Sequence, residues 1–132
     1  MELKRVVITG VGALTPIGNN KQEYWSSLEK GTNGAGPITR FDSKKFRTKF
    51  ACEIKNFDIL DHLNRKEVKK MDPNTQFGMV VGEEAVKDCG INLESLDKDS
   101  VGVIWGSGIG GLKTFQEEAI AYGLGDGTPR FN

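Results

Sequence analysis

Two short runs of apolar, mostly β-branched residues predict buried strands. They cover residues 5–9 (Arg-Val-Val-Ile-Thr) and residues 101–105 (Val-Gly-Val-Ile-Trp). Neither run alternates with polar residues, which is typical of a strand covered on both faces. Each run leads into a glycine-rich turn, at residues 10–18 and 106–111. We therefore expect two interior strands, each followed by a turn.

Helical spacing and capping residues predict four helices around these strands. The first runs from about Asn20, a capping residue, to Gly31, a natural residue to follow a helix. Asn64 opens a short one, with Glu67 completing a pattern like a capping box. The remaining two begin at Asp72-Pro73, ending at Gly90, and at about Leu112. Alternating strand and helix in this order predicts an α/β fold.

The helix predicted for residues 72–90 contains two glycines at i and i+4, Gly78 and Gly82. Each costs about 1 kcal/mol relative to alanine inside a helix. Such glycines indicate that another backbone packs close by, so we place this helix in the interior. Between the helices, residues 33–47 read as a loop, and residues 48–55 alternate as a half-exposed strand. The glycine-rich segment 123–132 reads as a loop that closes on nothing within the sequence.

Charge is balanced over the chain but not along it. The formal net charge is zero, which gives no reason to expect nucleic acid or a membrane as partner. Residues 40–71 carry +5 and residues 72–132 carry −6. No segment reaches the roughly 20 apolar residues of a membrane span. We expect a cytoplasmic protein whose acidic partners bind its middle third.

The potentially reactive residues form no recognisable site. The turn at Gly10-Val-Gly12 lacks the third glycine of a dinucleotide fingerprint, and residues 106–111 lack the Gly-Lys-Ser/Thr of a phosphate loop. Cys52, Cys89 and the single histidine, His62, have no metal-ligand spacing. Packing is the favoured role for all three, although a disulfide between the cysteines stays open. We predict no catalytic residue, no metal and no cofactor here.

A cluster of basic residues is the strongest candidate for binding. Its members form i,i+4 pairs on one side of the short helix, while Val68 and Met71 point the other way. They are Arg65, Lys66, Lys69 and Lys70. Four like charges on one face repel one another, which favours an anionic partner. An ordinary solvated helix face is the equal alternative on these residues alone.

Three ordered motifs resemble the β-ketoacyl-acyl carrier protein synthases of the elongating, synthase II kind. Residues 5–18 are similar to the family's opening strand and its Thr-Gly-x-Gly-x-x-[Ser/Thr]-Pro-x-Gly turn. Residues 65–72, together with Gln76, resemble the Arg-Lys-x-x-x-[Arg/Lys]-Met-Asp segment. Residues 106–112 resemble the Gly-[Ser/Thr]-Gly-x-Gly-Gly turn. The likeness runs through the whole chain, including Phe41-Asp42 and residues 48–51.

The resemblance implies a thiolase-like fold with layers α-β-α-β-α, of which residues 1–132 form the first part of the N-terminal half. It implies an acyltransferase of fatty acid biosynthesis that condenses an acyl thioester with malonyl-acyl carrier protein, and a homodimer in the full-length protein. The expected partner is acyl carrier protein, loaded with acyl or malonyl groups. The family's nucleophilic cysteine lies further along the chain than Asn132. We therefore expect these residues alone to be inactive.

The same resemblance assigns two sites. The basic helix, with Arg65, Lys66, Lys69 and Lys70, matches the docking surface for acyl carrier protein. Ile109 matches an apolar residue of the acyl pocket. Flanking glycines and two downstream apolar residues complete the predicted pocket: Gly108, Gly110, Gly111, Leu112 and Phe115.

Other functions remain open on the sequence. The full-length protein could be a polyketide-type synthase or an inactive chain-length partner of the same fold. The residue at the nucleophile position distinguishes these, because cysteine favours catalysis and glutamine an inactive partner. A chain that ends at Asn132 would instead be a non-catalytic fragment.

Overall fold

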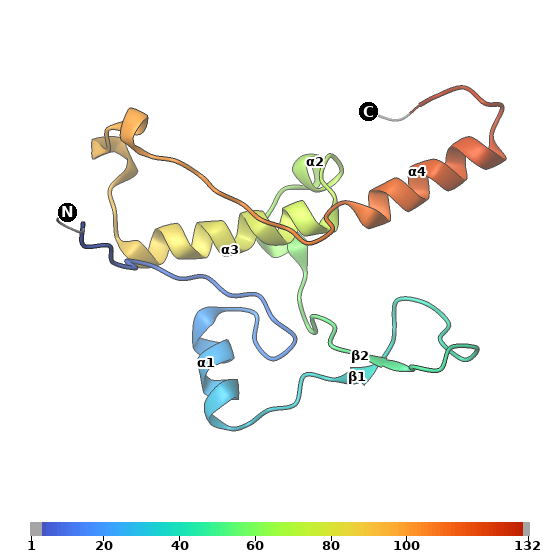
Figure 1. Cartoon of the computed structure of the whole chain (residues 1–132), viewed down its shortest axis with the longest axis horizontal. Helices are drawn as coiled ribbons and strands as arrows, with labels where there is room; N and C mark the ends of the chain where they lie inside the picture. Colours follow the sequence, from blue (N-terminus) through green and yellow to red (C-terminus); the bar gives the residue numbers. More distant parts are fainter. Residues whose placement is uncertain (1–3, 131–132) are drawn as a thin grey trace. The chain divides into compact units, whose positions relative to one another are not determined.

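The computed structural model describes residues 4–130 and divides into two compact units. Of these residues, the first unit comprises 4–58 and 80–91, and the second comprises 59–79 and 92–130. The long helix α3, Pro73–Cys89, contributes its beginning to the second unit and its remainder to the first (Figure 1). Residues 131 and 132, the last two of the predicted terminal loop, lie outside the described residues.

The first unit contains helix α1, Lys21–Glu29, as the capping pattern predicts. The backbone N–H of Glu23 donates to the side-chain oxygen of Asn20 at 2.9 Å, which satisfies one amide of the first turn. At the other end Gly31 adopts φ +63°, a left-handed conformation that glycine accepts without strain. Both predicted ends of this helix are therefore confirmed.

A two-stranded antiparallel ladder forms the sheet of the first unit. Strand β1, Gly36–Pro37, pairs with β2, Phe50–Ala51, with Gly36 opposite Ala51. Only these two residues of the predicted strand 48–55 are confirmed. The loop between the strands carries Phe41 and Phe46, whose rings meet edge to face with centroids 5.3 Å apart.

The glycine turn after residue 9 packs on α3 within the first unit, where the blue segment runs beside the yellow part of the helix in Figure 1. A Cβ atom on Gly12 would lie 2.2 Å from the carbonyl oxygen of Val81. Another backbone therefore packs close to α3, as predicted. The glycines that allow this contact belong to the turn, whereas the prediction assigned it to glycines of the helix. Val80, 7% exposed, is the buried apolar side chain of the described residues.

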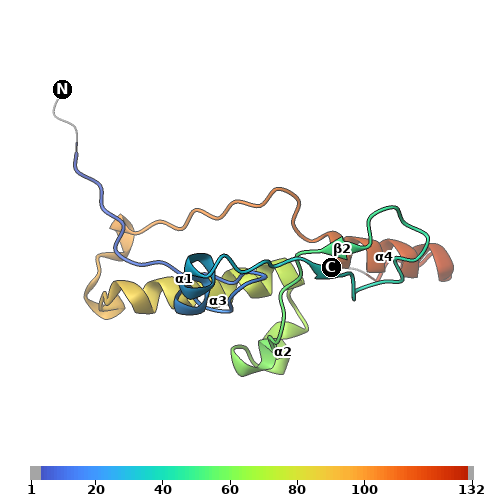
Figure 2. The same cartoon turned by 90° about the horizontal axis from the view of Figure 1, so that it is seen from below.

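The second unit is built from short helices around the beginning of α3. It contains η1, Ile59–Asp61, α2, Arg65–Val68, and α4, Leu112–Leu124, which confirms the predicted short and last helices. Two further 3-10 turns, η2 at Leu93–Ser95 and η3 at Lys98–Ser100, precede the second glycine turn. Figure 2 shows α2 standing out to one side of the first turn of α3.

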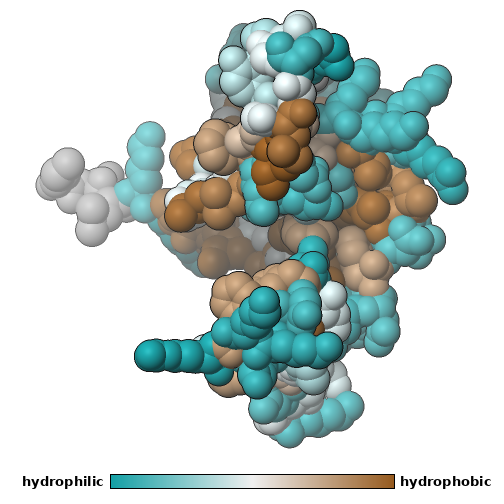
Figure 3. Space-filling view, turned by 90° about the vertical axis from the view of Figure 1, so that its right-hand side faces the viewer, coloured by the Kyte–Doolittle hydropathy of each residue, from teal (hydrophilic) through white to brown (hydrophobic). Residues whose placement is uncertain are grey.

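The two predicted interior strands are wrong for the described residues. Residues 5–9 and 101–105 form no strand, and their side chains are exposed, with Val6 at 89% and Ile104 at 99%. A strand needs a neighbour for its backbone groups, and within residues 4–130 the only named strands that pair are β1 and β2. Figure 3 shows hydrophobic side chains open at the surface between hydrophilic ones.

The interior position predicted for α3 is likewise only partly confirmed. Among the described residues, Gln76 and Val80 are its buried side chains. Gly78 does meet a close neighbour, since a Cβ there would lie 2.8 Å from the Trp105 ring, whereas Gly82 faces open space. The layered sheet of the predicted fold is not formed within residues 4–130, and the described part is rich in helix.

Candidate functional site

The α2 basic surface, defined as Arg65, Lys66, Lys69 and Lys70, is exposed at every position. Val68 and Met71 are half-buried behind it, as the helical pattern predicts. None of the four cations forms an ion pair within residues 4–130. The structure therefore brings together four cations without ion pairs, on α2 and directly after it.

Helix α2 has four residues and is too short to be stable alone. Side-chain hydrogen bonds hold it in place. Asn64 accepts from the backbone N–H groups of Lys66 and Glu67 at 3.1 and 3.0 Å. Its amide in turn donates to the Glu67 carboxylate at 2.6 Å. The predicted Asn64–Glu67 pairing is confirmed, with the Glu67 side chain bonding the Asn64 side chain where a capping box would use the backbone.

Gln76 fixes the other end of α2 from inside α3. This side chain is 8% exposed, and its Nε2 donates to the carbonyl oxygens of Val68 at 3.1 Å and Met71 at 2.8 Å. Carbonyls at the end of a helix lack partners of their own, and Gln76 supplies them. Sequence reasoning missed this role, because a search for apolar periodicity does not register a buried amide.

An apolar groove of about 560 Å³ lies along α4 in the second unit. Phe115, Ala119 and Tyr122 supply its apolar wall, at the helical spacing visible in the sequence. We call it the α4 groove; its complete lining is Asp72, Gly111, Thr114, Phe115, Glu118, Ala119 and Tyr122.

The α4 groove contains two of the six residues predicted for the acyl pocket, Gly111 and Phe115. The other four do not line it: Gly108, Ile109, Gly110 and Leu112. Ile109 is 75% exposed and Leu112 57% exposed. The role of all six in binding an acyl chain stays a prediction.

Asp72 joins the groove to the start of α3. One carboxylate oxygen, Oδ1, accepts from the Asn74 N–H at 2.9 Å. The other, Oδ2, accepts from the Thr114 N–H at 3.1 Å and from the Thr114 hydroxyl at 2.7 Å. These bonds hold the pKa of Asp72 below its usual range, the Asn74 N–H contributing most. Asp72 was predicted only to begin α3, since sequence alone does not bring Thr114 near it.

No described group forms a catalytic arrangement. Cys52 and Cys89 are free thiols, so the disulfide left open by the sequence is absent. The Cys89 thiol donates to the Val86 carbonyl at 2.9 Å, a local contact within α3. Residues 4–130 contain no group of His, Cys, Asp and Glu suited to holding a metal ion. Nor do they include a helix long and apolar enough to cross a membrane.

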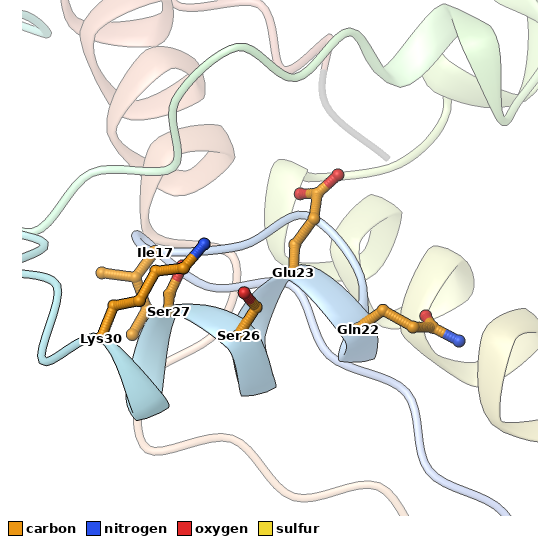
Figure 4. A pocket seen from close by; sticks show the side chains of 6 residues that line it. All are labelled: Ile17, Gln22, Glu23, Ser26, Ser27 and Lys30. Carbon is orange, nitrogen blue, oxygen red and sulfur yellow. The ribbon is translucent and has the colours of Figure 1, made fainter.

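A polar pocket on α1 also lacks reactive chemistry. Ile17, Gln22, Glu23, Ser26, Ser27 and Lys30 line it. Figure 4 shows Gln22 and Glu23 pointing away from Lys30, so these side chains do not converge on one point. Glu23 accepts from the Asn19 N–H at 2.8 Å, which assigns its carboxylate to the start of α1.

Comparison with known proteins gives one consistent result. The model of the family "Beta-ketoacyl synthase, N-terminal domain" matches residues 3–128. The chain is 46% identical over 118 residues to 3-oxoacyl-[acyl-carrier-protein] synthase 2 of Synechocystis, covering 89% of this chain. It is 48% identical over 113 residues to the protein of the same name from Staphylococcus aureus, covering 86% of this chain.

A solved structure agrees with this result. The ishigamide ketosynthase/chain length factor superposes with a TM-score of 0.62 at 33% identity over 68% of this chain, which is 22% of that protein. The match spans 28% of the Synechocystis relative and 27% of the Staphylococcus one. The chain therefore corresponds to just over a quarter of the length of these relatives.

Proposed function

This chain belongs to the beta-ketoacyl synthase family, and from that premise we propose that the whole protein is a 3-oxoacyl-[acyl-carrier-protein] synthase of fatty acid elongation. The names and identities of the two relatives support this activity. We further propose that the whole protein is a cytoplasmic homodimer with a thiolase-like layered fold. In that fold residues 5–9 and 101–105 become strands, which would bury their exposed apolar side chains.

The proposed reaction forms a carbon–carbon bond in two stages. An acyl group passes from carrier protein to a cysteine thiolate, and the carrier thiol leaves. The malonyl thioester then loses carbon dioxide, and the electron pair left on its α-carbon attacks the acyl thioester and displaces the cysteine. These chemical steps use residues outside 4–130. Residues 4–130 contribute by binding the carrier protein and by shaping the acyl pocket.

The observation that carries this proposal is the α2 basic surface, the four exposed cations that lack ion pairs within the described residues. An acidic carrier protein would be steered toward such a surface, and its association would weaken as salt screens the charges. Lys and Arg are almost never fully buried without a partner. We therefore expect these charges to stay accessible when the rest of the protein is present.

Charge reversal on this surface tests the proposal in the full-length protein. The double variant Lys66→Glu, Lys69→Glu should raise KM for acyl carrier protein substrates about 10-fold at low salt, with kcat little changed, because exposed charges govern encounter. A carrier-free acyl thioester should react at the wild-type rate. Lys98→Glu, an exposed cation on η3, is the matched control. An unchanged KM in the double variant would exclude α2 as the docking surface.

An inactive chain-length partner is the second candidate. The ishigamide ketosynthase/chain length factor names both kinds of protein, so its structural likeness fits this candidate less well than the two relatives fit a synthase. The residue at the nucleophile position separates the two candidates, with cysteine expected for a synthase and glutamine for an inactive partner. Sequencing the natural gene past the codon for Asn132 gives the answer.

A further inference from the structure

We propose that Asp72 is a positioning residue that caps two helices at once. It thereby fixes the position of the α4 groove relative to the α2 basic surface. The inference rests on the proposed function, because it assigns the groove to the acyl chain and the basic surface to the carrier. All the contacts that support it lie inside the second unit.

Helix α4 has no side-chain cap of its own. The residue before it is Gly111, at φ +73°, which has no side chain to accept from the first turn. Backbone N–H groups of a first turn have no partner within the helix. Oδ2 of Asp72 accepts from one of them, the Thr114 N–H, across 42 residues of sequence. The carboxylate also suits the positive end of the helix dipole.

The carboxylate of Asp72 also caps α3. Its Oδ1 accepts from the Asn74 N–H in the first turn after Pro73. Asp72 therefore bonds the first turns of both helices, and neither oxygen can move without releasing one of them. The Thr114 hydroxyl adds a third bond, at 2.7 Å.

Helix α3 contacts the segment before α4 at two further points. A Cβ on Gly110 would lie 2.9 Å from Nδ2 of Asn74, so that turn rests directly on the amide. The Trp105 ring covers Gly78 in the same way, at 2.8 Å from a Cβ built there. The beginning of α3 thus contacts residues 105–114 at several points and holds them in position.

The same part of α3 also holds α2. Gln76 lies on the same part of α3 and bonds the Val68 and Met71 carbonyls. Asp72 follows Met71 directly and also lines the α4 groove. One short stretch, residues 71–76, therefore holds the basic surface on one side and the groove wall on the other.

The consequence is a specific effect on the acyl chain. Loosening the Asp72–Thr114 contact would shift Thr114 and Phe115, which line the groove, without removing any charge from the α2 basic surface. Long acyl chains fill more of a pocket than short ones and depend more on its walls. Substrate length preference should therefore change, while carrier recognition should not.

The test uses the full-length protein and carrier protein loaded with a long or a short saturated acyl chain. Asp72→Asn should lower the ratio of kcat/KM for long over short chains about 10-fold, a size typical of altered fit in an apolar pocket. Thr114→Val, which keeps the backbone N–H but loses the hydroxyl, should lower it less. Thr114→Ser should restore the wild-type ratio.

Asp97 provides a matched control, because it caps η3 by the same chemistry in the same unit. It accepts from the Asp99 N–H at 3.2 Å and from the Ser100 hydroxyl at 2.8 Å, and it does not line the groove. Asp97→Asn and Ser100→Ala should leave the length ratio unchanged even if they lower the melting temperature.

The outcomes separate the inference from the function beneath it. An active Asp72→Asn or Thr114→Val protein with the wild-type ratio would overturn the positioning role and leave the synthase function standing. If Asp72→Asn does not fold, Thr114→Val and its serine rescue decide alone. A correctly folded wild-type protein that condenses no acyl chain would overturn the proposed function, and this inference with it.

Discussion

The two glycine turns both begin with Gly-x-Gly, but their surroundings differ. Residues 10–18 and residues 106–111 each follow an apolar run and each lead to a helix. In the first turn, Cβ atoms built on Gly10 and Gly12 would lie 2.3 and 2.2 Å from carbonyl oxygens of α3. In the second, Gly106, Gly108 and Gly111 face open space within 4 Å.

The polar contacts to α3 also differ between the two turns, and the first turn is again the more closely held. Glu84 accepts from the Ala13 N–H at 2.7 Å and from the Lys21 N–H at 2.9 Å. Asp88 accepts from the Val11 N–H and pairs with the Lys21 side chain. Two carboxylates of α3 therefore fasten residues 11–13 of the first turn and the start of α1, whereas the second turn meets Asn74 at Gly110 and Asp72 bonds only Thr114 beyond it. The first turn uses glycine for close packing, whereas the second keeps Gly106, Gly108 and Gly111 uncovered.

Alanine substitution should give the largest contrast between the turns. Gly12→Ala places a methyl group against the α3 backbone, which cannot move aside as a side chain would, and should destabilise the full-length protein by about 1–3 kcal/mol or more. Gly108→Ala meets no neighbour and should change stability by less than about 0.5 kcal/mol. Denaturant unfolding measures both. Equal losses would show that the two turns are packed alike.

Removing the charge that fastens the first turn should have the next largest effect. In Glu84→Gln the amide oxygen can still accept one backbone N–H, but the NH₂ group faces the other. Losing a bond to a charged acceptor should cost about 1.5–3 kcal/mol.

The neighbouring Glu83→Gln is the control for this change. Glu83 is exposed and forms an i,i+4 ion pair with Lys87, so its loss should cost only about 0.3–0.5 kcal/mol. Urea unfolding of the two variants side by side gives the comparison. A Glu84→Gln variant as stable as Glu83→Gln would mean that the Glu84 bonds do not hold the first turn, which would leave Asp88 and packing to do so.

Local signals in the sequence predicted the helices well. Asn20, Asn64 and Pro73 mark helix starts, and Gly31 and Gly90 mark ends with left-handed φ. These features depend on residues within one or two turns, which the sequence displays directly. The strands at 5–9 and 101–105 failed because a strand depends on a neighbour, and no described segment pairs with either. Apolar pattern alone cannot show whether the partner lies within the same residues.

The candidate site divides in the same way. The α2 basic surface could be predicted, because i,i+4 spacing brings Arg65 near Lys69 and Lys66 near Lys70. The apolar stripe of α4 was equally visible. The contacts of Asp72 with Thr114 and of Glu84 with Ala13 and Lys21 could not be predicted, since each joins distant segments through one polar side chain. Such bonds leave no periodic trace in a sequence.

The smallest expected effect concerns the charge of Asp72 at the second turn. Its pKa lies below the usual value in the folded state. The carboxylate therefore contributes stability that is fully present above the unfolded pKa, about 3.9. That contribution is lost as pH falls through the folded pKa. Asp72→Asn should therefore lose less free energy of unfolding than the wild type as the pH falls through the acidic range. Near neutral pH the variant should show no added pH dependence of the free energy of unfolding.

Thr114→Val sharpens the same measurement. It removes one bond to the carboxylate, so the pKa of Asp72 should move toward its ordinary value. The shift should be incomplete, because the Asn74 N–H is the largest cause of the lowered pKa and remains in place. Carbon-13 titration of the Asp72 carboxyl group reads this directly. A pKa unmoved by the valine would mean that the Thr114 hydroxyl does not bond Asp72 in solution, so that only the Thr114 N–H joins α4 to this carboxylate.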